Sequence, residues 1–407
     1  MWEVIMRILI SGSSIAGPVL AYWLTRYGFD VTVVERAPTL RKTGGHAVDL
    51  FRPAMEISAK MGVLPRIEAL ATGTDRLTMY REGRPKAVRI DLAKIYAATS
   101  DSHVEIMRDD LSEIYYDAGR DDVEYLFGDS ITAIEHDGTV TFEHAAARTF
   151  DVIVGADGLH SHVRRLTFGE EAELTRFLGG YLSVVSAPKA LVEAGEMVAH
   201  VGAGRLAGIY TADHLDDARA VFMFRSKTEL DYDHHDALRQ KELLHQAFTG
   251  LHEQVDGWLG ELERTPTFYF DSITQLRTDR WSRRRVTLVG DAGYCPGPAV
   301  GGSTSLAVLG AYVLAGELAE ADGDHLRAFA AYELRMHEPV HRSRNFARGA
   351  AKAIIPGSRI GLWALTRGAQ LISAMPGSLS RSVAKLNTKG IRMHDSMPVP
   401  EYTGSDV

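Results

Sequence analysis

The pattern of apolar and polar positions predicts a strand, a turn, a helix and a second strand near the N-terminus. Apolar side chains fill residues 8–10, recur at spacings of three and four from Val19 to Leu24, and dominate residues 31–34. A period near 3.6 residues is typical of a helix with one buried face, and short apolar runs are typical of buried strands. Residues 7–36 therefore predict one strand–helix–strand unit.

The rest of the chain follows two further patterns. A hairpin is expected at 77–90, a strand buried on both faces at 151–154, and a similar strand at 285–289. Between these two buried strands the sequence is rich in short β-type runs, whereas helical spacing dominates from Ser303 onward. This order predicts an α/β fold in which a β lobe interrupts a strand–helix domain. The predicted boundaries are 1–168 and 285–322 for the strand–helix domain, 169–284 for an inserted antiparallel β-sheet lobe, and 323–407 for C-terminal helices.

A glycine turn separates the first strand from the helix that follows it. Gly12 permits a tight turn, Gly17 permits close approach of helix and strand, and the helix N-terminus directs N–H groups at a phosphate. Glu35 ends the second strand, where dinucleotide-binding units place an acid that accepts hydrogen bonds from a ribose. Ser14 replaces the usual middle glycine. An ordinary glycine turn is the alternative, but the order of strand, turn, helix, strand and acid favours a dinucleotide.

Two later strand ends also carry an aspartate beside a glycine. Asp157 follows the strand at 151–154, and Asp291 follows the strand at 285–289. Ligands of open α/β sheets bind outside the carboxyl ends of the strands, so we expect both turns to join the first one around a single cofactor. For Asp157 alone, capping of the next helix is the alternative interpretation.

Composition excludes several classes of protein. The 407 residues suffice for two domains, and 45% hydrophobic with 24% charged residues is typical of a globular chain. A net charge of −8 argues against a nucleic-acid partner, because binding phosphates requires a basic surface. The single cysteine, Cys295, excludes an internal disulfide and fits a reducing cytoplasm; we interpret it as a small buried residue, with a redox role as the alternative. No metal is expected, because His160, His162 and residues 234–235 lack partners at ligand spacing.

No segment is expected to insert stably into a membrane. The N-terminus lacks the basic region and the long apolar core of a secretory signal. A membrane-spanning helix needs roughly 20 consecutive apolar residues. The stretch that comes nearest, 350–375, is interrupted by Lys352, Pro356, Arg359 and Arg367.

The three motifs, in this order and separated by a β-rich region, resemble those of the class A flavoprotein monooxygenases. These are the FAD-dependent aromatic hydroxylases of the para-hydroxybenzoate hydroxylase type. The resemblance covers residues 7–318 and implies a Rossmann-like FAD-binding domain with an inserted antiparallel β-sheet substrate lobe. The loop at 44–50 resembles the tetracycline-modifying and polyketide-tailoring members in particular. The FAD-binding residues that the resemblance implies are Gly12, Ser14, Ile15, Ala16, Glu35, Arg36, Arg108, Asp157, Asp291, Gly301, Gly302 and Ser303.

The resemblance also implies a reaction. NAD(P)H reduces FAD, O₂ adds to the flavin as a C4a-hydroperoxide, and one oxygen passes to an aromatic or polycyclic, polyketide-like small molecule. The electron donor would dock transiently near Arg41, Lys42, Arg164 or Arg165, for which surface solubility is an equally good explanation. No substrate-activating base can be chosen, and a monomer or a homodimer is expected. Four aromatic residues either wall the substrate site or form sheet core: Tyr181, Tyr210, Phe222 and Phe224.

Some positions depart from the family pattern. Gly293 and Tyr294 stand where Ala-His is frequent, and Gly310 stands where the following helix often has an acid. These departures concern pocket shape and flavin dynamics rather than cofactor identity. Two alternative functions remain open at this point. One is an FAD-dependent reductase or dehydrogenase without oxygen insertion, and the other is a non-catalytic protein that binds flavin or a drug.

Overall fold

The computed structural model describes residues 5–40, 45–94, 103–233, 236–265, 268–298, 302–374 and 393–403. Its first sheet has the strand order β17-β18-β11-β1-β2-β7, with every pair parallel except β17 with β18. Apolar side chains are buried on both faces of its central strands, as a parallel sheet covered on both sides requires. The strands are β1 (Arg7–Ser11), β2 (Asp30–Glu35), β7 (Glu124–Phe127), β11 (Val152–Gly155), β17 (Ser282–Arg283) and β18 (Val286–Leu288).

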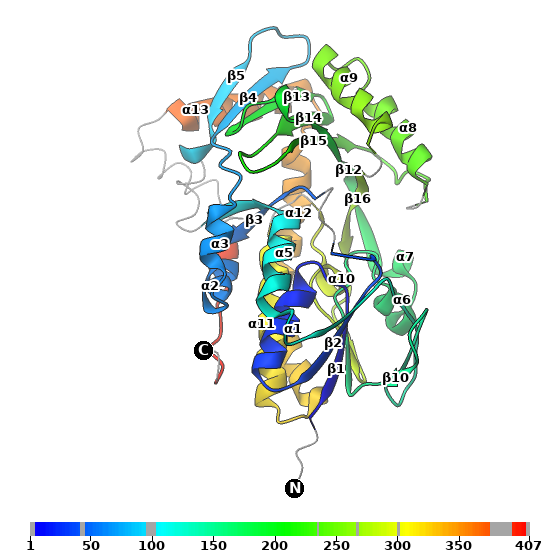
Figure 1. The fold of residues 1–407 in the computed structure, drawn as a ribbon. Coiled ribbons are helices and arrows are strands. Elements are labelled where there is room, and N and C mark those ends of the chain that lie inside the picture. The colour runs from blue at the N-terminus through cyan, green and yellow to red at the C-terminus, as the bar shows by residue number, and fades with distance from the viewer. Residues whose placement is uncertain are drawn as a thin grey trace.

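Helices pack around this sheet and around each other. α11 (Ser303–Glu320) is apolar on all sides and is buried almost completely, because α1 (Ala16–Arg26), α2 (Arg52–Lys60) and α12 (His325–Ile354) all pack on it. α12 runs beside α11 and extends to a second sheet, which lies above the first in Figure 1. The other helices of this part are α3 (Leu64–Ala69), α5 (Arg108–Gly119), α6 (His162–Phe168), α7 (Glu171–Leu174) and α10 (Asp291–Tyr294).

A second sheet has seven strands in the order β16-β12-β15-β14-β13-β4-β5, and only β13 with β4 is parallel. One face is covered by α8 (Ala237–Phe248), α9 (Glu253–Gly260) and η2 (Glu261–Glu263), and the far edge by α13 (Arg359–Ala374) (Figure 1). The strands are β4 (Arg76–Arg81), β5 (Val88–Asp91), β12 (Thr175–Pro188), β13 (Glu196–Gly202), β14 (Arg205–Tyr210), β15 (Asp217–Arg225) and β16 (Tyr269–Leu276); η1 (Lys189–Leu191) follows β12.

The lobe sheet takes in more of the chain than residues 169–284. The hairpin β4–β5, at residues 76–91, pairs with β13 at the edge of the sheet, although the sequence boundaries assigned it to the strand–helix domain. β4 supplies hydrogen-bond partners for the backbone of β13, which would otherwise be an exposed edge strand. The local sequence does not show which distant strand fills this role. Within the part of the chain that the structure describes, the other predicted elements are found. The division into two domains with C-terminal helices stays a prediction.

Two smaller sheets complete the fold. β3 (Ala47–Phe51) pairs antiparallel with β6 (His103–Met107), and it packs on α11 and α2. β8 (Ile131–Ile134), β9 (Thr139–Phe142) and β10 (Arg148–Thr149) form a three-stranded sheet beside α6. Within the residues that the structure describes, every helix is too short or too polar to cross a membrane.

Candidate active site

Two glycine turns meet at the carboxyl edge of the six-stranded sheet. Gly12 follows β1 with a φ of +108°, and a Cβ at this position would lie 2.6 Å from the carbonyl oxygen of Ala156, in the turn after β11. Only glycine allows this approach, because a side chain would strike the neighbouring backbone. A Cβ on Gly17 would lie 1.9 Å from the carbonyl oxygen of Gly12, so the helix start is equally close. The first turn is therefore as tight as the sequence predicts.

Glu35, the last residue of β2, points back to this first turn. Its Oε2 accepts a hydrogen bond from the backbone N–H of Ser13 at 2.9 Å, and Oε1 accepts one from Ala37 at 2.9 Å. A carboxylate oxygen can accept more than one hydrogen bond, so these contacts orient Glu35 and leave acceptor capacity for a ligand. The hydroxyl oxygen of Ser13 is buried and has no hydrogen-bond partner among the described residues.

The third turn, after β18, lies against the first. A Cβ on Gly290 would lie 3.3 Å from the Cβ of Ala16. Asp291 Oδ1 accepts a hydrogen bond from the hydroxyl of Ser303 at 2.9 Å, which ties this turn to the first residue of α11. Gly302, with a φ of +82°, precedes that residue in a left-handed conformation that favours glycine. The turn after β1 and the turn after β18, which are far apart in the sequence, therefore lie together at one edge of the sheet.

Arg108, at the start of α5, reaches the same turn from the side. Its Nη2 donates a hydrogen bond to Ser14 Oγ at 3.2 Å, and the hydroxyl of Ser112 donates to the Ser14 carbonyl oxygen at 3.0 Å. The serine that replaces the usual glycine is therefore held by α5. The backbone N–H of Arg108 donates to the carbonyl oxygen of His46 at 3.0 Å, so Arg108 also joins the turn to the loop before β3.

Asp157 uses its carboxylate to cap α6. Its Oδ2 accepts hydrogen bonds from the backbone N–H groups of His162 at 2.8 Å and Val163 at 3.1 Å, and Oδ1 accepts one from the hydroxyl of Ser161. The structure therefore contains the capping arrangement that the sequence offered as the alternative. A contact between this carboxylate and a cofactor stays a prediction.

The remaining predicted site residues differ in their surroundings. Ile15 and Ala16 are buried at the start of α1, beside the first turn. Arg36 is exposed beyond Glu35. Gly301 lies outside the described residues.

The loop leading into β3 connects the start of α5, which contacts the first turn, to the β lobe. The backbone N–H of Ala47 donates to the hydroxyl of Tyr210 in β14 at 2.7 Å, and Arg219 Nε in β15 donates to the Gly45 carbonyl oxygen at 3.1 Å. From the other side, Asp109 of α5 accepts a hydrogen bond from the Gly45 N–H at 2.8 Å. Residues 45–47 are thus fixed by both parts of the molecule.

One face of the lobe sheet looks onto this loop. Tyr210 and Arg219 are direct partners in the β14–β15 register, so their side chains point the same way. Tyr269 of β16 approaches the loop as well, with its ring centroid 5.9 Å from that of His46. Burial and the nearby charge of Arg108 lower the pKa of His46 to about 4, and burial raises the pKa of the Tyr269 phenol. Both side chains are therefore neutral near pH 7.

His160 forms a second link between the turns and the lobe. It follows the Asp157–Gly158 turn, and its Nδ1 lies 2.9 Å from Glu171 Oε1 while its Nε2 lies 3.0 Å from Asp271 Oδ2 in β16. Burial by itself favours the neutral ring, but the hydrogen bonds and charges of the two carboxylates outweigh it and raise the pKa to about 9. The imidazolium bridges the two carboxylates. This bridge could not be predicted from the sequence, because Asp271 is 111 residues away from His160 in the chain.

Comparisons with known proteins establish the family. A profile described as "FAD binding domain" matches residues 6–327. An uncharacterized protein of Mycobacterium tuberculosis (strain ATCC 25618 / H37Rv) is 41% identical over 348 residues, which cover 83% of this chain and 91% of that protein. The chain belongs to the FAD-binding-domain family.

Two relatives of named function show to which group of this family the protein belongs. A flavin-dependent monooxygenase of Legionella longbeachae serogroup 1 (strain NSW150) is 32% identical over 381 residues, which cover 93% of this chain and 97% of that protein. The crystal structure of tetracycline destructase Tet(55) superposes with a TM-score of 0.82 and 30% identity, and covers 99% of this chain and 100% of that one. The protein is a class A FAD-dependent monooxygenase, as the motifs indicated.

The residues of this monooxygenase fit FAD. The first turn has no side chain at Gly12 that would obstruct a pyrophosphate, and the N-terminus of α1 follows directly. Glu35 is already oriented, and the unpartnered hydroxyl of Ser13 is a polar group that a cofactor oxygen would satisfy. The Asp291–Ser303 pair stands at the start of α11, where the ribityl chain is expected.

The structure excludes some of the residues that the sequence suggested for substrate binding or for docking of the electron donor. Tyr181, Phe222 and Phe224 are sheet core under α8 and α9, so of the four aromatic candidates only Tyr210 faces the loop before β3. Arg164 is 1% exposed, and its guanidinium donates to the Ala292 carbonyl oxygen at 2.9 Å. It is therefore a buried structural residue and unavailable to a docking electron donor.

The lone cysteine and the other three candidate docking residues also have to be placed. Cys295 is fully buried, and burial raises the pKa of its thiol, as expected for a small packing residue. Arg165 is exposed, and its guanidinium contacts His162. Arg41 and Lys42 lie outside the described residues.

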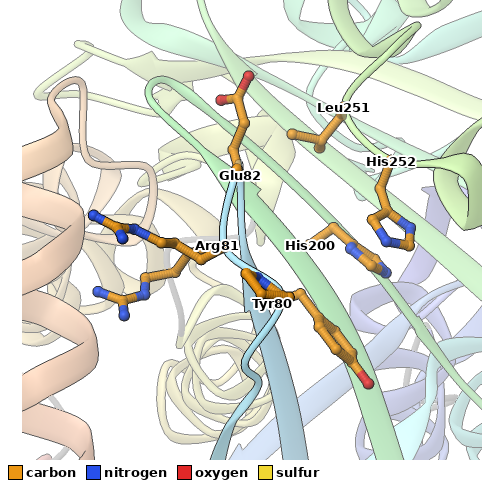
Figure 2. A pocket seen from close by; sticks show the side chains of 9 residues that line it. Tyr80, Arg81, Glu82, His200, Leu251 and His252 are labelled. Carbon is orange, nitrogen blue, oxygen red and sulfur yellow. The ribbon is translucent and has the colours of Figure 1, made fainter.

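The small pocket in Figure 2 lies away from these turns. It has a volume of about 200 Å³ and opens between the β4–β5 turn, His200 of β13 and the segment before α9. The rings of His200 and His252 stack at 4.1 Å, and Tyr80 stacks on His200 at 5.0 Å (Figure 2). The pocket is below the size of typical ligand sites, so the convergence of turns, rather than this cavity, defines the candidate active site.

Proposed function

We propose that this FAD-dependent monooxygenase hydroxylates a polycyclic phenolic molecule of the tetracycline or aromatic polyketide type. The observation that carries the proposal is the loop at 45–47, which is held between the start of α5 and the lobe face bearing Tyr210, Arg219 and Tyr269. Aromatic rings with a few fixed polar groups are the usual wall for a planar ligand. The 30% identity with tetracycline destructase Tet(55) over almost the whole chain supports the same substrate class.

The proposed FAD contacts follow the three turns. The backbone N–H groups of Gly12 and Ser13 already donate to Val34 and Glu35, so those of residues 14–16 bind the pyrophosphate, which lies against Gly12. Glu35 binds the ribose, and Arg108 approaches the cofactor beside Ser14. Asp291 and Ser303 bind the ribityl chain, and Gly302 lies against the flavin ring. Arg36, Asp157 and Gly301 complete the proposed set.

The bound FAD supplies the redox chemistry, because after reduction by NAD(P)H it activates O₂ for transfer of one oxygen atom to the substrate. The protein residues orient the substrate and exclude water. Arg219 is 4% exposed, its Nε is bound to Gly45 and its guanidinium is paired with Asp217, so it fixes the loop on the lobe face. Neutral Tyr269 and His46 are suited to hydrogen bonding with phenol and ketone groups.

The proposal is tested by turnover of a substrate panel. Purified protein is loaded with FAD, and oxidation of NADH and NADPH is followed with tetracycline, simple phenols and anthraquinone-type polyketides. A polycyclic phenol should stimulate NAD(P)H oxidation and yield a product heavier by one oxygen atom that derives from ¹⁸O₂. A reduced product without added oxygen would instead support a reductase, and tight binding without turnover would support a sequestering protein. Stimulation by simple phenols alone would contradict the polycyclic class.

A further inference from the structure

The residues 393–403 return to the FAD-binding side of the molecule and lie against α2 and α11. Arg52, at the start of α2, donates a hydrogen bond from Nη2 to the Met397 carbonyl oxygen at 2.9 Å and from its backbone N–H to Asp395 Oδ1 at 3.3 Å. Its Nε also donates to the Asp395 carbonyl oxygen at 2.5 Å. In Figure 1 the red segment passes α2 and ends below it, at the C label. One end of the segment is therefore fixed to the helix that follows β3.

The other end is fixed to α11. The hydroxyl of Tyr402 donates to Glu317 Oε1 at 2.7 Å, and its ring takes the space beside Gly316, where a Cβ would lie 2.3 Å from it. The hydroxyl of Tyr312 donates to the Pro400 carbonyl oxygen at 3.0 Å. Anchors at both ends give the residues between them a defined position.

His394 is placed by these anchors at the N-terminus of α11. A Cβ on Gly302, the residue before α11, would lie 1.9 Å from Cε1 of His394. The imidazole stacks on Phe51 with centroids 5.3 Å apart and planes at 9°, and the edge of Phe346 approaches it at 6.2 Å. Phe51 is joined to the same helix, because its N–H donates to Ser305 Oγ at 2.9 Å. The ring therefore lies directly against Gly302, one of the predicted FAD-binding residues.

Both nitrogens of this imidazole lack a hydrogen-bond partner among the described residues, and the side chain is 1% exposed. Burial lowers its pKa to about 4, so near pH 7 the ring is neutral and has one donor and one acceptor. Buried polar groups without a partner are rare and destabilise the fold, so each one indicates a water, an ion or a ligand that satisfies it. An apolar ring would fill the same space between Phe51 and Phe346 without this cost.

We propose that His394 is a cofactor-contacting residue, which hydrogen-bonds the polar edge of the flavin ring at the N-terminus of α11. The inference rests on the proposed placement of the flavin ring beside Gly302. The ring edge carries alternating N–H and C=O groups, which a neutral imidazole can match as donor and acceptor. The C-terminal segment is accordingly part of the active site, and not only a cover for α2 and α11.

Two variants separate this role from packing. His394→Phe keeps an aromatic ring on Phe51 and removes both nitrogens, whereas His394→Asn keeps hydrogen-bonding groups at smaller volume. Each variant is stripped of FAD and titrated with FAD by flavin fluorescence, and the visible spectrum of the bound flavin and the melting temperature of the apoprotein are recorded. The matched control is His252→Phe, a second stacked imidazole, in the pocket of Figure 2.

His394→Phe should weaken FAD binding about 5- to 10-fold, as loss of one ordinary hydrogen bond predicts. It should also move the visible flavin band while leaving the apoprotein melting temperature equal or higher. His394→Asn should recover part of the affinity and spectrum, and His252→Phe should leave both unchanged. Wild-type affinity and spectrum in His394→Phe would overturn the inference, and so would an affinity loss equal in both His→Phe variants. These measurements do not depend on substrate turnover. An incorrect assignment of His394 can therefore be distinguished from an incorrect assignment of the substrate class.

Discussion

The phenol oxygen of Tyr294 lies beside Gly310 so closely that a Cβ on Gly310 would be 1.8 Å from it. Tyr294 ends the short helix after the Gly290–Asp291 turn, and Gly310 lies within α11. These are two of the positions at which the sequence departs from the family pattern. The two departures depend on each other in the structure, because the phenol of Tyr294 occupies the space that a side chain at position 310 would need. The hydroxyl of Tyr332 donates to Tyr294 at 3.1 Å and completes the contact.

This contact reverses the usual effect of a helical Gly→Ala substitution. In an open helix position the change stabilises by roughly 1 kcal/mol. Gly310→Ala should instead lower the free energy of unfolding by about 1–3 kcal/mol, as overpacking does. In a Tyr294→Ala background the same substitution should be neutral or stabilising. Urea unfolding of the four apoproteins measures the coupling.

Gly349 of α12 provides the control for this cycle, because nothing lies within 4 Å of a Cβ placed there. Gly349→Ala should stabilise the protein in both backgrounds by the same amount. Additive costs for Gly310→Ala and Tyr294→Ala would contradict the coupling between the two positions.

Gly12→Val should abolish retention of FAD. A side chain at this position meets the Ala156 backbone and enters the space proposed for the pyrophosphate, and its φ of +108° is unfavourable for valine. Absorbance of the purified protein near the flavin band, with an apoprotein titration, gives the measurement. Gly28→Ala is the control, since its φ is +84° but nothing lies within 4 Å of the added Cβ. Yellow Gly12→Val protein with normal affinity would refute the placement.

Glu35→Ala should weaken FAD binding by about 1–3 kcal/mol, through loss of hydrogen bonds to the ribose and of the contacts that orient the Ser13 N–H. The visible spectrum of any flavin that remains bound should be unchanged, because the ribose is remote from the ring. Isothermal titration of the apoprotein with FAD measures the affinity. Glu143→Ala, at an exposed glutamate of the same part of the chain, should bind FAD normally.

The His160 bridge should make stability depend on pH. Its pKa is raised in the folded protein to about 9 by Asp271 and Glu171, against a value of about 6.5 for an unperturbed histidine. The contribution is thus fully present below pH 6.5 and is lost as the pH rises through about 9. The stability difference between wild type and His160→Gln should therefore be larger at pH 6 than at pH 9.5. A difference that does not vary with pH would mean that folding leaves the pKa of this imidazole unchanged, and would contradict the charged bridge.

The local sequence determined the secondary structure and the positions of the cofactor turns. Gly12, Glu35 and Asp291 were recognisable because strand, turn and helix follow each other within a few residues, and such short-range order is encoded by periodicity and by glycine. Parallel strands align their carboxyl ends, so the convergence of the turns was predictable from the strand order. The close approach of Gly12 to Ala156 and of Gly290 to Ala16 agrees with that expectation.

Only the tertiary structure decided which side chains complete the site. The position of β4 in the lobe sheet, the bridge from His160 to Asp271 and the contact of His394 with Gly302 all join segments that are far apart in the chain. Alternation along a strand does not say which face meets a partner, so Tyr210 and Phe222 could not be told apart until the sheet was placed. Packing between distant elements depends on their mutual geometry, and no local pattern contains it.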